Sequence, residues 1–295
     1  MNTTQIGYLC ALAAALIWSG FILVSRFGGI SELTSYDVIA IRYVTCAFLV
    51  LPIWWIKFRF RLFDKRLVAA SIIGGLIYAL FTFQGFSTAP ASHAAILLAG
   101  LMPLFIIVLS YFINGERPSM KKWLGIGLIT LGIALLFLPL LQGGLLNSGH
   151  FYFVAGALCW SLFSVLIKRW NISPWEVTIS LAVVTFVIYM PFYLLFAPKA
   201  ISINLWSAIA IQAIYQGFLA TIVQVIFFVK AVQLIGPSSM GSMMAIVPLI
   251  SGVSALFIFN EPFSLTLMFG LILVSFGAWF AHSRFFFNSL SYKPK

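Results

Sequence analysis

The chain carries the segment PLFIIVLSYFINGE at residues 103–116 and a matching segment, PLISGVSALFIFNE, at residues 248–261. Each begins with proline and ends with glutamate, and the offset between them is 145 positions. Other residues recur at nearly the same offset: Gly125 as Gly270, Gly132 as Gly277, and Trp18-Ser19 as Trp160-Ser161. The chain therefore reads as two copies of one unit, which we place at residues 1–146 and 147–295.

Composition predicts an integral membrane protein. Hydrophobic residues make up 62% of the chain and charged residues 8%, with a mean hydropathy of +1.09. A soluble domain of this length needs far more polar surface. The first apolar run, from Gly7, lacks the flanks of a cleaved signal peptide, so we expect it to be retained as a span. Cys10, Cys46 and Cys159 lie in apolar runs without a CxxC spacing and are expected to be unpaired.

Apolar runs of a length that can cross a bilayer as a helix occur ten times. We place these spans at residues 7–24, 36–56, 68–86, 93–113, 123–141, 151–167, 175–196, 205–229, 238–259 and 263–281. Five spans per copy is an odd number, so the second copy must cross in the opposite direction. The predicted fold class is all-α, with ten transmembrane helices arranged as two inverted five-helix repeats around a central cavity, the usual construction of a secondary transporter.

The basic residues predict the orientation, because Lys and Arg collect on the cytoplasmic side of a membrane protein. With the amino terminus inside, the outer segments hold Arg26 and Lys199. The inner segments hold Lys57, Arg59, Arg61, Lys65, Arg66, Arg117, Lys121, Lys122, Lys168, Arg169, Lys230, Arg284, Lys293 and Lys295. Both termini are thus predicted to be cytoplasmic, in the cytoplasmic (inner) membrane. The net charge of +11 then reflects contact with the lipid bilayer, and no nucleic-acid partner is expected.

Interruptions at matching positions of the two copies are the best sequence indication of a transport site. Pro103 and Pro248 form such a pair, each about ten residues into its span, where proline removes a backbone donor and bends the helix. We predict that they act as hinges or line the cavity. Close packing of helices is the alternative.

Polar and aromatic residues inside the spans are candidates for substrate contact. Uncharged polar groups in hydrocarbon normally turn toward the bundle interior, so packing is again the alternative. The candidates are Trp18, Ser19, Tyr78, Gln84, Trp160, Ser161, Ser164, Tyr215, Gln216, Thr221 and Gln224.

Two ionisable residues within the spans allow more than one interpretation. Arg42 could pair with Glu32 or Asp37, or could attract a substrate carboxylate. His93 could line the outer mouth of the cavity or be an ordinary interfacial histidine. The matched Glu116 and Glu261 stand at span ends, where capping or loop anchoring is the favoured role.

Several function classes are disfavoured by what the spans lack. They contain no carboxylate in a span core for an organic cation, no HExxH or Cys/His ligand set for a metal, and no GxSxG or P-loop. An enzyme is not expected, nor is a metal or other cofactor.

These features together resemble the EamA-type branch of the drug/metabolite transporter (DMT) superfamily. The resemblance rests on the two five-span halves, ALIWSG at residues 15–20, Arg42-Tyr43, Pro103 with Asn114-Gly115-Glu116, and Pro248 with Asn260-Glu261-Pro262. It implies a bundle in which spans one to four and six to nine enclose the cavity while five and ten stand apart. It also implies export of amino acids or related metabolites. The length and the aromatic-rich spans are similar to YddG-type exporters of aromatic amino acids, although no motif supports this narrower match.

We therefore expect a carrier that exports a small amphipathic metabolite, an amino acid first, by alternating access. A nucleotide-sugar or phosphorylated-metabolite carrier is the alternative within transport, and a membrane scaffold with a closed cavity is the alternative outside it. The expected partners are a small-molecule substrate and the bilayer. A monomer is compatible with the sequence.

Overall fold

The structure, a computed structural model, describes residues 2–282, without the side chains of 232, 233, 236–239, 241, 242 and 282. All regular structure in these residues is helical. The first half contains α1 Thr3–Ile30, α2 Ser35–Ile53, η1 Trp54–Phe58, α3 Lys65–Ser71, η2 Ile72–Ile77, α4 Tyr78–Thr88, α5 Ala91–Ala94, η3 Ala95–Gly100, α6 Leu101–Asn114 and α7 Met120–Gln142. The second contains α8 Ser148–Arg169, α9 Pro174–Leu195, η4 Ile203–Leu205, α10 Trp206–Gln212, η5 Ala213–Val223, α11 Gln224–Met244, α12 Val247–Ile258 and α13 Leu265–His282.

Among the described residues, eight helical segments are long and apolar enough to cross a membrane, and two apolar helices are shorter. The shorter ones, Val247–Ile258 and Leu265–Ala281, fall in the predicted ninth and tenth spans. The main difference from the sequence prediction lies before them, where α11 continues through the expected connection at 230–237 as far as Met244. The helix ends there because the ring of Pro248 would clash with the Met244 carbonyl, four residues earlier, in a continuous α-helix.

Local sequence signals set the helix ends. Side chains at four starts accept a backbone N–H and complete a capping box: Asn2 before α1, Thr34 before α2, Asn147 before α8 and Ser173 before α9. Gly115 follows α6 with a φ of 69°, and Asn260, which follows α12, has a φ of 50°. These residues occupy matching positions of the two copies, so both copies leave the helix through a left-handed residue.

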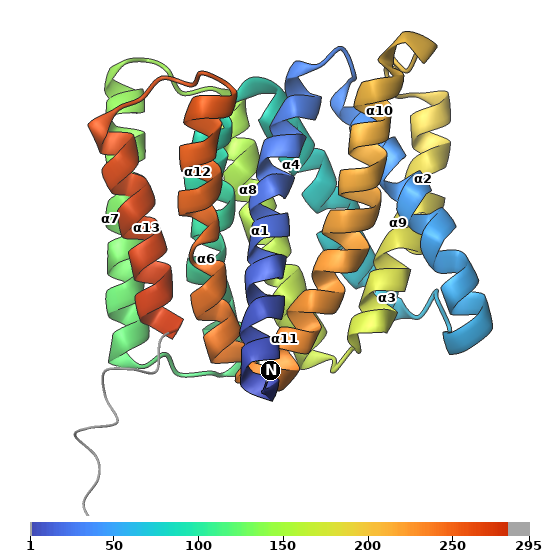
Figure 1. Cartoon of the computed structure of the whole chain (residues 1–295), viewed down its shortest axis with the longest axis horizontal. Helices are drawn as coiled ribbons and strands as arrows, with labels where there is room; N and C mark the ends of the chain where they lie inside the picture. The colour runs from blue at the N-terminus through green and yellow to red at the C-terminus, as the bar shows by residue number, and fades with distance from the viewer. Residues whose placement is uncertain (1, 283–295) are drawn as a thin grey trace, which may run out of the picture.

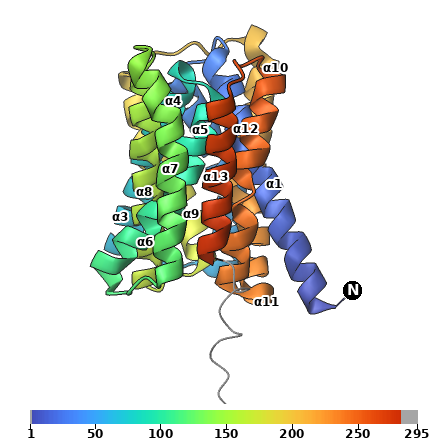
Figure 2. The ribbon, with the colours of Figure 1, turned by 90° about the vertical axis from the view of Figure 1, so that its left-hand side faces the viewer.

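The helices lie side by side in a bundle. Figure 1 shows α7 and α13 at one edge of the molecule and α2 and α9 at the other, with α1, α4 and α8 between them. The view turned by 90° shows that α1 is inclined to α7 and α13 (Figure 2).

The edge pair α7 and α13 packs through the repeated glycines, which we call the glycine seam: Gly125, Gly132, Gly270 and Gly277. A Cβ atom on Gly125 would lie 2.7 Å from the Gly277 carbonyl oxygen, and one on Gly132 would lie 2.8 Å from that of Gly270. Such distances leave no room for a side chain, so the two backbones touch. The pairing of 125 with 277 and of 132 with 270 also shows that the helices run antiparallel.

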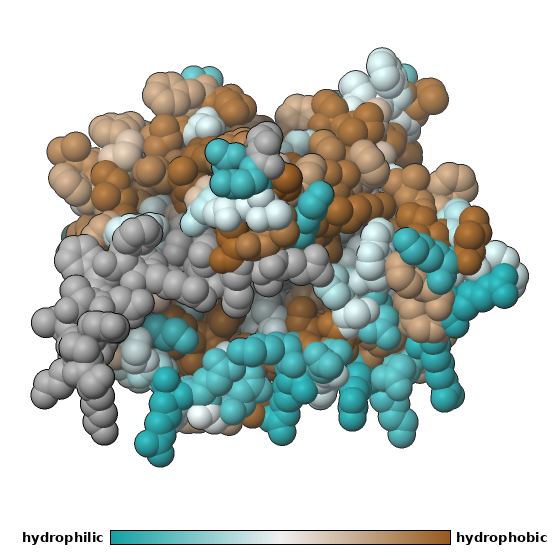
Figure 3. All heavy atoms as spheres, turned by 60° about the horizontal axis from the view of Figure 1, so that its bottom comes forward, coloured by the Kyte–Doolittle hydropathy of each residue, from teal (hydrophilic) through white to brown (hydrophobic). Residues whose placement is uncertain are grey.

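Basic side chains gather at one end of the bundle. This basic end holds Lys57, Arg59, Arg61, Lys65, Arg66, Arg117, Lys121, Lys122, Lys168, Arg169 and Lys230, and hydrophilic side chains project from it in Figure 3. The opposite end holds Arg26 and Lys199. Arg284, Lys293 and Lys295, which the sequence assigned to the inner side, lie outside the described residues.

Candidate functional site

A cavity of about 240 Å³ lies between α1, α2, α4, α8, α9, η5 and α11. It extends from Arg42 in the interior to Ile172, in the connection between α8 and α9, and Pro174, the first residue of α9, at the basic end. Its walls are formed by Trp18, Phe21, Arg42, Tyr78, Trp160, Phe163, Ser164, Ile167, Ile172, Pro174, Val177, Thr178, Leu181, Ala220, Thr221, Gln224, Val225, Phe228 and Val229.

Aromatic rings from both copies form one wall. The ring centroids of Trp18 and Trp160, the matched tryptophans, lie 6.1 Å apart. Trp160 also lies 4.8 Å from Tyr78 and 5.1 Å from Phe163, centroid to centroid. Tilted aromatic pairs at these separations attract each other and hold their rings in place. The wall is therefore a fixed apolar surface to which a flat ring can bind.

Arg42 is the one charged side chain among the lining residues. It is 4% exposed, and its Nη1 donates to Gln216 Oε1 at 3.3 Å, while its Nε has no hydrogen-bond partner in the described structure. Its guanidinium carbon lies 5.4 Å from the Phe21 ring centroid and 6.0 Å from that of Phe83. The rings offset part of the cost of burying the cation.

No carboxylate of the described residues forms an ion pair with Arg42. Asp37, a partner that the sequence suggested, instead accepts hydrogen bonds from Tyr193 Oη at 2.6 Å and from the Ala200 N–H at 3.0 Å. Pairing with Asp37 or Glu32 is therefore not what the structure shows. A buried cation with an unused donor is left beside the cavity, where an anion would compensate it.

Three more of the predicted hydroxyl and amide residues line the cavity: Ser164, Thr221 and Gln224. Ser164 donates to the Trp160 carbonyl at 2.7 Å, and Thr221 to the Gln216 carbonyl at 2.6 Å. Their oxygens keep free acceptor sites. Gln216 itself is fully buried behind Arg42, where its Nε2 donates to Ser25 Oγ at 2.9 Å. It positions the guanidinium rather than forming the cavity surface.

Five predicted residues lie away from the cavity walls. The Ser19 hydroxyl donates to the Ala15 carbonyl of its own helix. The Ser161 hydroxyl donates to the Ala157 carbonyl of its own helix at 2.7 Å and lies 3.3 Å from the Met102 carbonyl of α6. Tyr215 donates to the Ile17 carbonyl at 3.1 Å and fills the space beside Gly20. The last two are near the opposite end: Gln84 Oε1 accepts from Ser35 Oγ at 3.3 Å, and His93 Nδ1 lies 2.9 Å from His150 Nε2.

The sequence did not single out most of the apolar lining residues or Thr178. The Thr178 Oγ1 is buried beside the cavity without a hydrogen-bond partner. No signal distinguishes Phe21, Phe163 or Phe228 in the sequence, because their helices are apolar on every side. Thr178 could have been found as a hydroxyl near the start of the span predicted at residues 175–196.

The matched prolines lie outside the cavity wall, at helix interruptions. Pro103 is in the first turn of α6, directly after the π-helical η3. Pro248 is in the first turn of α12, after the break at Ala245 and Ile246. In each copy the α-helical hydrogen-bond ladder is thus broken just before the proline.

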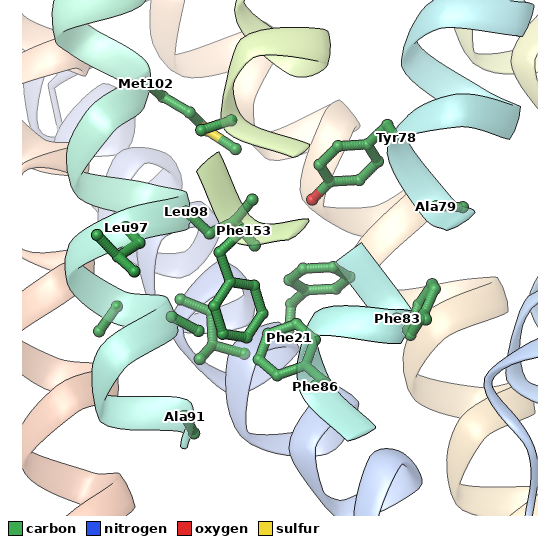
Figure 4. Packing of buried hydrophobic residues seen from close by; sticks show 14 of the residues in the cluster. Phe21, Tyr78, Ala79, Phe83, Phe86, Ala91, Leu97, Leu98, Met102 and Phe153 are labelled. Atoms are coloured by element: carbon green, nitrogen blue, oxygen red, sulfur yellow. The ribbon is translucent and has the colours of Figure 1, made fainter. Parts of the chain in front are cut away.

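Aromatic packing closes the bundle between the cavity and the opposite end. The rings of Phe21, Phe86 and Phe153 lie together in Figure 4, and Tyr78 lies farther toward the cavity. The Phe86 and Phe153 centroids are 4.9 Å apart, and those of Phe21 and Phe83 are 6.3 Å apart. We call Phe21, Phe83, Phe86 and Phe153 the phenylalanine plug. It separates the cavity from the opposite end of the molecule.

Known proteins resemble both copies of the chain. Residues 5–138 and 147–282 each match the EamA-like transporter family. The chain is 26% identical to an uncharacterized transporter of Archaeoglobus fulgidus over 220 residues, which cover 74% of this chain and 76% of that protein. It is 32% identical to the uncharacterized transporter YwfM of Bacillus subtilis over 43% of this chain and 44% of that protein.

A third relative has a named substrate class. The chain is 32% identical to the aromatic amino acid exporter YddG of Ancylobacter novellus over 133 residues, 43% of this chain and 46% of that protein. A solved crystal structure, 22% identical, superposes with a TM-score of 0.63 over 95% of this chain and 96% of its own. That likeness supports the helical fold alone.

The two family matches cover most of the chain, the apolar helices can span a bilayer, and a cavity extends from the interior of the bundle to the basic end. The chain is thus a multi-pass membrane protein that belongs to the EamA-like transporter family of the drug/metabolite transporter superfamily.

Proposed function

We propose that this transporter exports amino acids, those with aromatic side chains and their analogues first, from the cytoplasm by alternating access. The observation that carries the proposal is the position of Arg42, a buried cation without a carboxylate partner. It lies at the deep end of a cavity with aromatic walls, in the interior of the bundle. The substrate and the bilayer are the partners, a monomer suffices, and no cofactor is required.

Arg42 suits a carboxylate because its donors are fixed before the substrate arrives. Gln216 holds Nη1, and Phe21 and Phe83 flank the guanidinium, so little side-chain entropy is lost on binding. A charge-assisted hydrogen bond to Nε would satisfy the unused donor. The ligand that fits carries a negative charge at one end.

The aromatic wall suits the other end of such a ligand. Trp18, Tyr78 and Trp160 present ring faces on the same cavity that holds Arg42. The volume, about 240 Å³, is below the roughly 300 Å³ at which cavities for drug-sized ligands begin. A single amino acid is the size of substrate that this space supports.

The proposed mechanism rests on ten spans in two inverted repeats with both termini in the cytoplasm. The antiparallel contact of α7 with α13 through matched glycines supports the inversion. The basic residues support a cytoplasmic basic end. The cavity reaches that end and is closed by the phenylalanine plug at the other, as in a carrier ready to load from inside.

A nucleotide-sugar or phosphorylated-metabolite carrier fits the cavity less well. A phosphate ligand calls for several Lys or Arg side chains around it, and Arg42 is the one cation on the described wall. Lys230 lines a groove that adjoins the cavity near the basic end, away from Arg42, so the two cations do not surround one site.

Flux in proteoliposomes tests the proposal. We expect saturable counterflow of radiolabelled tryptophan that unlabelled phenylalanine competes for. Tryptamine, which lacks the carboxylate, should compete at least about tenfold more weakly. Competition by UDP-sugars with none by amino acids would support the alternative carrier, and no flux of any kind would favour a scaffold.

Reporter fusions test the topology separately. A reporter that matures only in the cytoplasm should be active after Lys65 or Lys121, at the basic end, and inactive after Gly144. Activity at Gly144 would contradict the orientation while leaving the substrate assignment open to the flux assay.

A further inference from the structure

Beyond the phenylalanine plug, the opposite end of the bundle is held together by a polar cluster that we call the outer tie: Arg26, Glu261 and the backbone groups of Phe86, Ala91 and Ser92. Glu261 Oε1 accepts from the Ala91 N–H at 2.6 Å, and its Oε2 accepts from the Ser92 N–H at 2.8 Å. The carboxylate thus caps the segment Ala91–Asn114 from the loop between α12 and α13, a capping role that the sequence favoured for it.

Arg26 connects this carboxylate to the plug. Its Nη1 donates to the Phe86 carbonyl at 2.7 Å, and its Nε lies 3.9 Å from Glu261 Oε1. The side chains of Arg26 and Glu261 are 18% and 5% exposed. One buried charge pair therefore fastens α1, the α4 segment that carries Phe86, the start of α5 and the α12–α13 loop to one another.

The basic end has a corresponding pair, the inner pair of Lys168 and Glu116. Lys168 Nζ donates to Glu116 Oε1 at 2.6 Å, and the two side chains are 67% and 38% exposed. The hydrogen bond from Lys168 lowers the pKa of the Glu116 carboxyl below its ordinary value. In the described contacts this carboxylate reaches no helix start equivalent to Ala91 and Ser92, so the inner pair joins only α8 to the end of α6.

The sequence repeat relates these two pairs. Glu116 and Glu261 are 145 positions apart, the offset of the matched prolines, and Arg26 and Lys168 are 142 positions apart, the offset of the matched tryptophans. Each pair joins the first span of one copy to the fourth span of the other. The same contact therefore occurs twice, buried at the closed end and exposed at the end that the cavity reaches.

We infer that the outer tie is the gate that holds the outer end of the transporter closed, and that the inner pair is its counterpart, which takes the buried form when the inner end closes. The inference goes beyond the proposed function and rests on it only for alternating access. Breaking a charge pair that is shielded from water is costly, whereas an exposed pair contributes little to stability. The difference in burial therefore favours the conformation that we describe.

Opening the outer end exposes Arg26 and Glu261 to water and frees Phe86 from the guanidinium, so the plug can separate. Burial of Lys168 and Glu116 at the inner end offsets part of this cost. Each conformation therefore keeps one buried charge pair: the outer tie when the outer end is closed, and the inner pair when the inner end is closed.

A cysteine in the cavity reports which end is open. We suggest Ala220→Cys in a Cys159→Ala background, with the buried Cys10 and Cys46 kept and the background without Ala220→Cys as the blank. Labelling by a membrane-impermeant maleimide is compared in right-side-out and inside-out vesicles, without substrate. Glu261→Gln should raise labelling from outside by about tenfold relative to labelling from inside, since it weakens the charge-assisted hydrogen bonds from two N–H groups and removes the ion pair with Arg26.

Glu32→Gln is the matched control, because Glu32 is an exposed carboxylate at the same end and outside the outer tie. Its labelling ratio should equal that of the parent. Glu116→Gln should shift the ratio the other way by up to about tenfold, because it removes the pair that is buried when the inner end closes. The double variant should fall between the two single variants.

If Glu261→Gln labels like Glu32→Gln, or if both single variants shift the ratio in the same direction, the inference is wrong. Arg26→Gln removes the cation of the outer tie. If Glu261→Gln does not purify as a monodisperse protein, the labelling ratio of Arg26→Gln tests the inference in its place. Because no substrate is present, the result is independent of whether amino acids are carried.

Discussion

The glycine seam and the tryptophan pair are both made of residues that the sequence repeats, and both join one copy to the other. At the seam, Gly132 and Gly270 let α7 and α13 touch through their backbones. At the cavity, Trp18 and Trp160 meet through their rings, 6.1 Å apart, and a cavity is left beside them. The repeated residues lie where the two copies meet. Where they are glycines the helices pack directly against each other, and where they are tryptophans a cavity is left beside the rings.

The seam should be the more sensitive of the two to substitution. Gly132→Leu forces a side chain against the Gly270 carbonyl and Val274, so we expect a loss of stability of about 3 kcal/mol and loss of the monodisperse protein in detergent. Gly127→Leu is the matched control, because no atom lies within 4 Å of a Cβ atom at this exposed position on the same helix. Thermal unfolding followed by size-exclusion chromatography measures both. Equal stability of the two variants would show that the seam is not tightly packed.

Substitutions at the cavity should reduce substrate binding without destabilising the fold. Arg42→Gln removes the cation that we assign to the substrate carboxylate, so affinity for tryptophan should fall about 10- to 100-fold. Competition by tryptamine should be nearly unchanged. Arg42→Lys keeps the charge without the forked donors and should be intermediate. An equal loss for both ligands would indicate that Arg42 supports the fold instead.

Trp160→Ala tests the ring surface itself. It removes contacts with Trp18, Tyr78 and Phe163, and the affinity for aromatic substrates should fall about tenfold while the protein stays monodisperse. Ser161→Ala, the next residue along, is the control, because its hydroxyl is bound inside the helix packing and away from the cavity. If the alanine at 160 unfolds the protein, the tryptophan pair acts as a packing contact like the seam.

The matched prolines should have the smallest effect on transport, and it should fall on rate more than on affinity. Alanine at Pro103 or Pro248 restores a backbone donor at a break in the helix, and transport should slow by about threefold with affinity nearly unchanged. The two variants should shift cavity labelling toward opposite ends, because the spans that carry them run in opposite directions. Wild-type rates in both would show that the prolines are packing features and not hinges.

The sequence predicted the parts of this molecule that depend on local patterns. Apolar run lengths located the apolar helices, because the bilayer sets a minimum helix length. The structure places both matched tryptophans on the wall of one cavity. The course of α11 was predicted wrongly. The sequence placed a connection at residues 230–237, but the helix ends only near Pro248, where a ring clash stops it.

The sequence could not predict which side chains of an apolar helix face the cavity. Ser19 and Ser164 lie on similarly apolar helices, and both donate to a carbonyl four residues earlier, yet only Ser164 faces the cavity. A serine can satisfy its own hydroxyl in this way on any face of a helix, so its presence does not mark a polar site. Phe21, which links Arg42 to the phenylalanine plug, has no sequence neighbour that sets it apart from other phenylalanines.

The inclination of α1 should make transport sensitive to the thickness of the membrane. With 28 residues, α1 is about 42 Å long, longer than the hydrocarbon core of a bilayer, which is about 30 Å thick, and it is inclined to α7 and α13 (Figure 2). The same helix carries Trp18 at the cavity and Arg26 in the outer tie. A change of tilt moves these two residues together, so lipid acyl-chain length should set the transport rate.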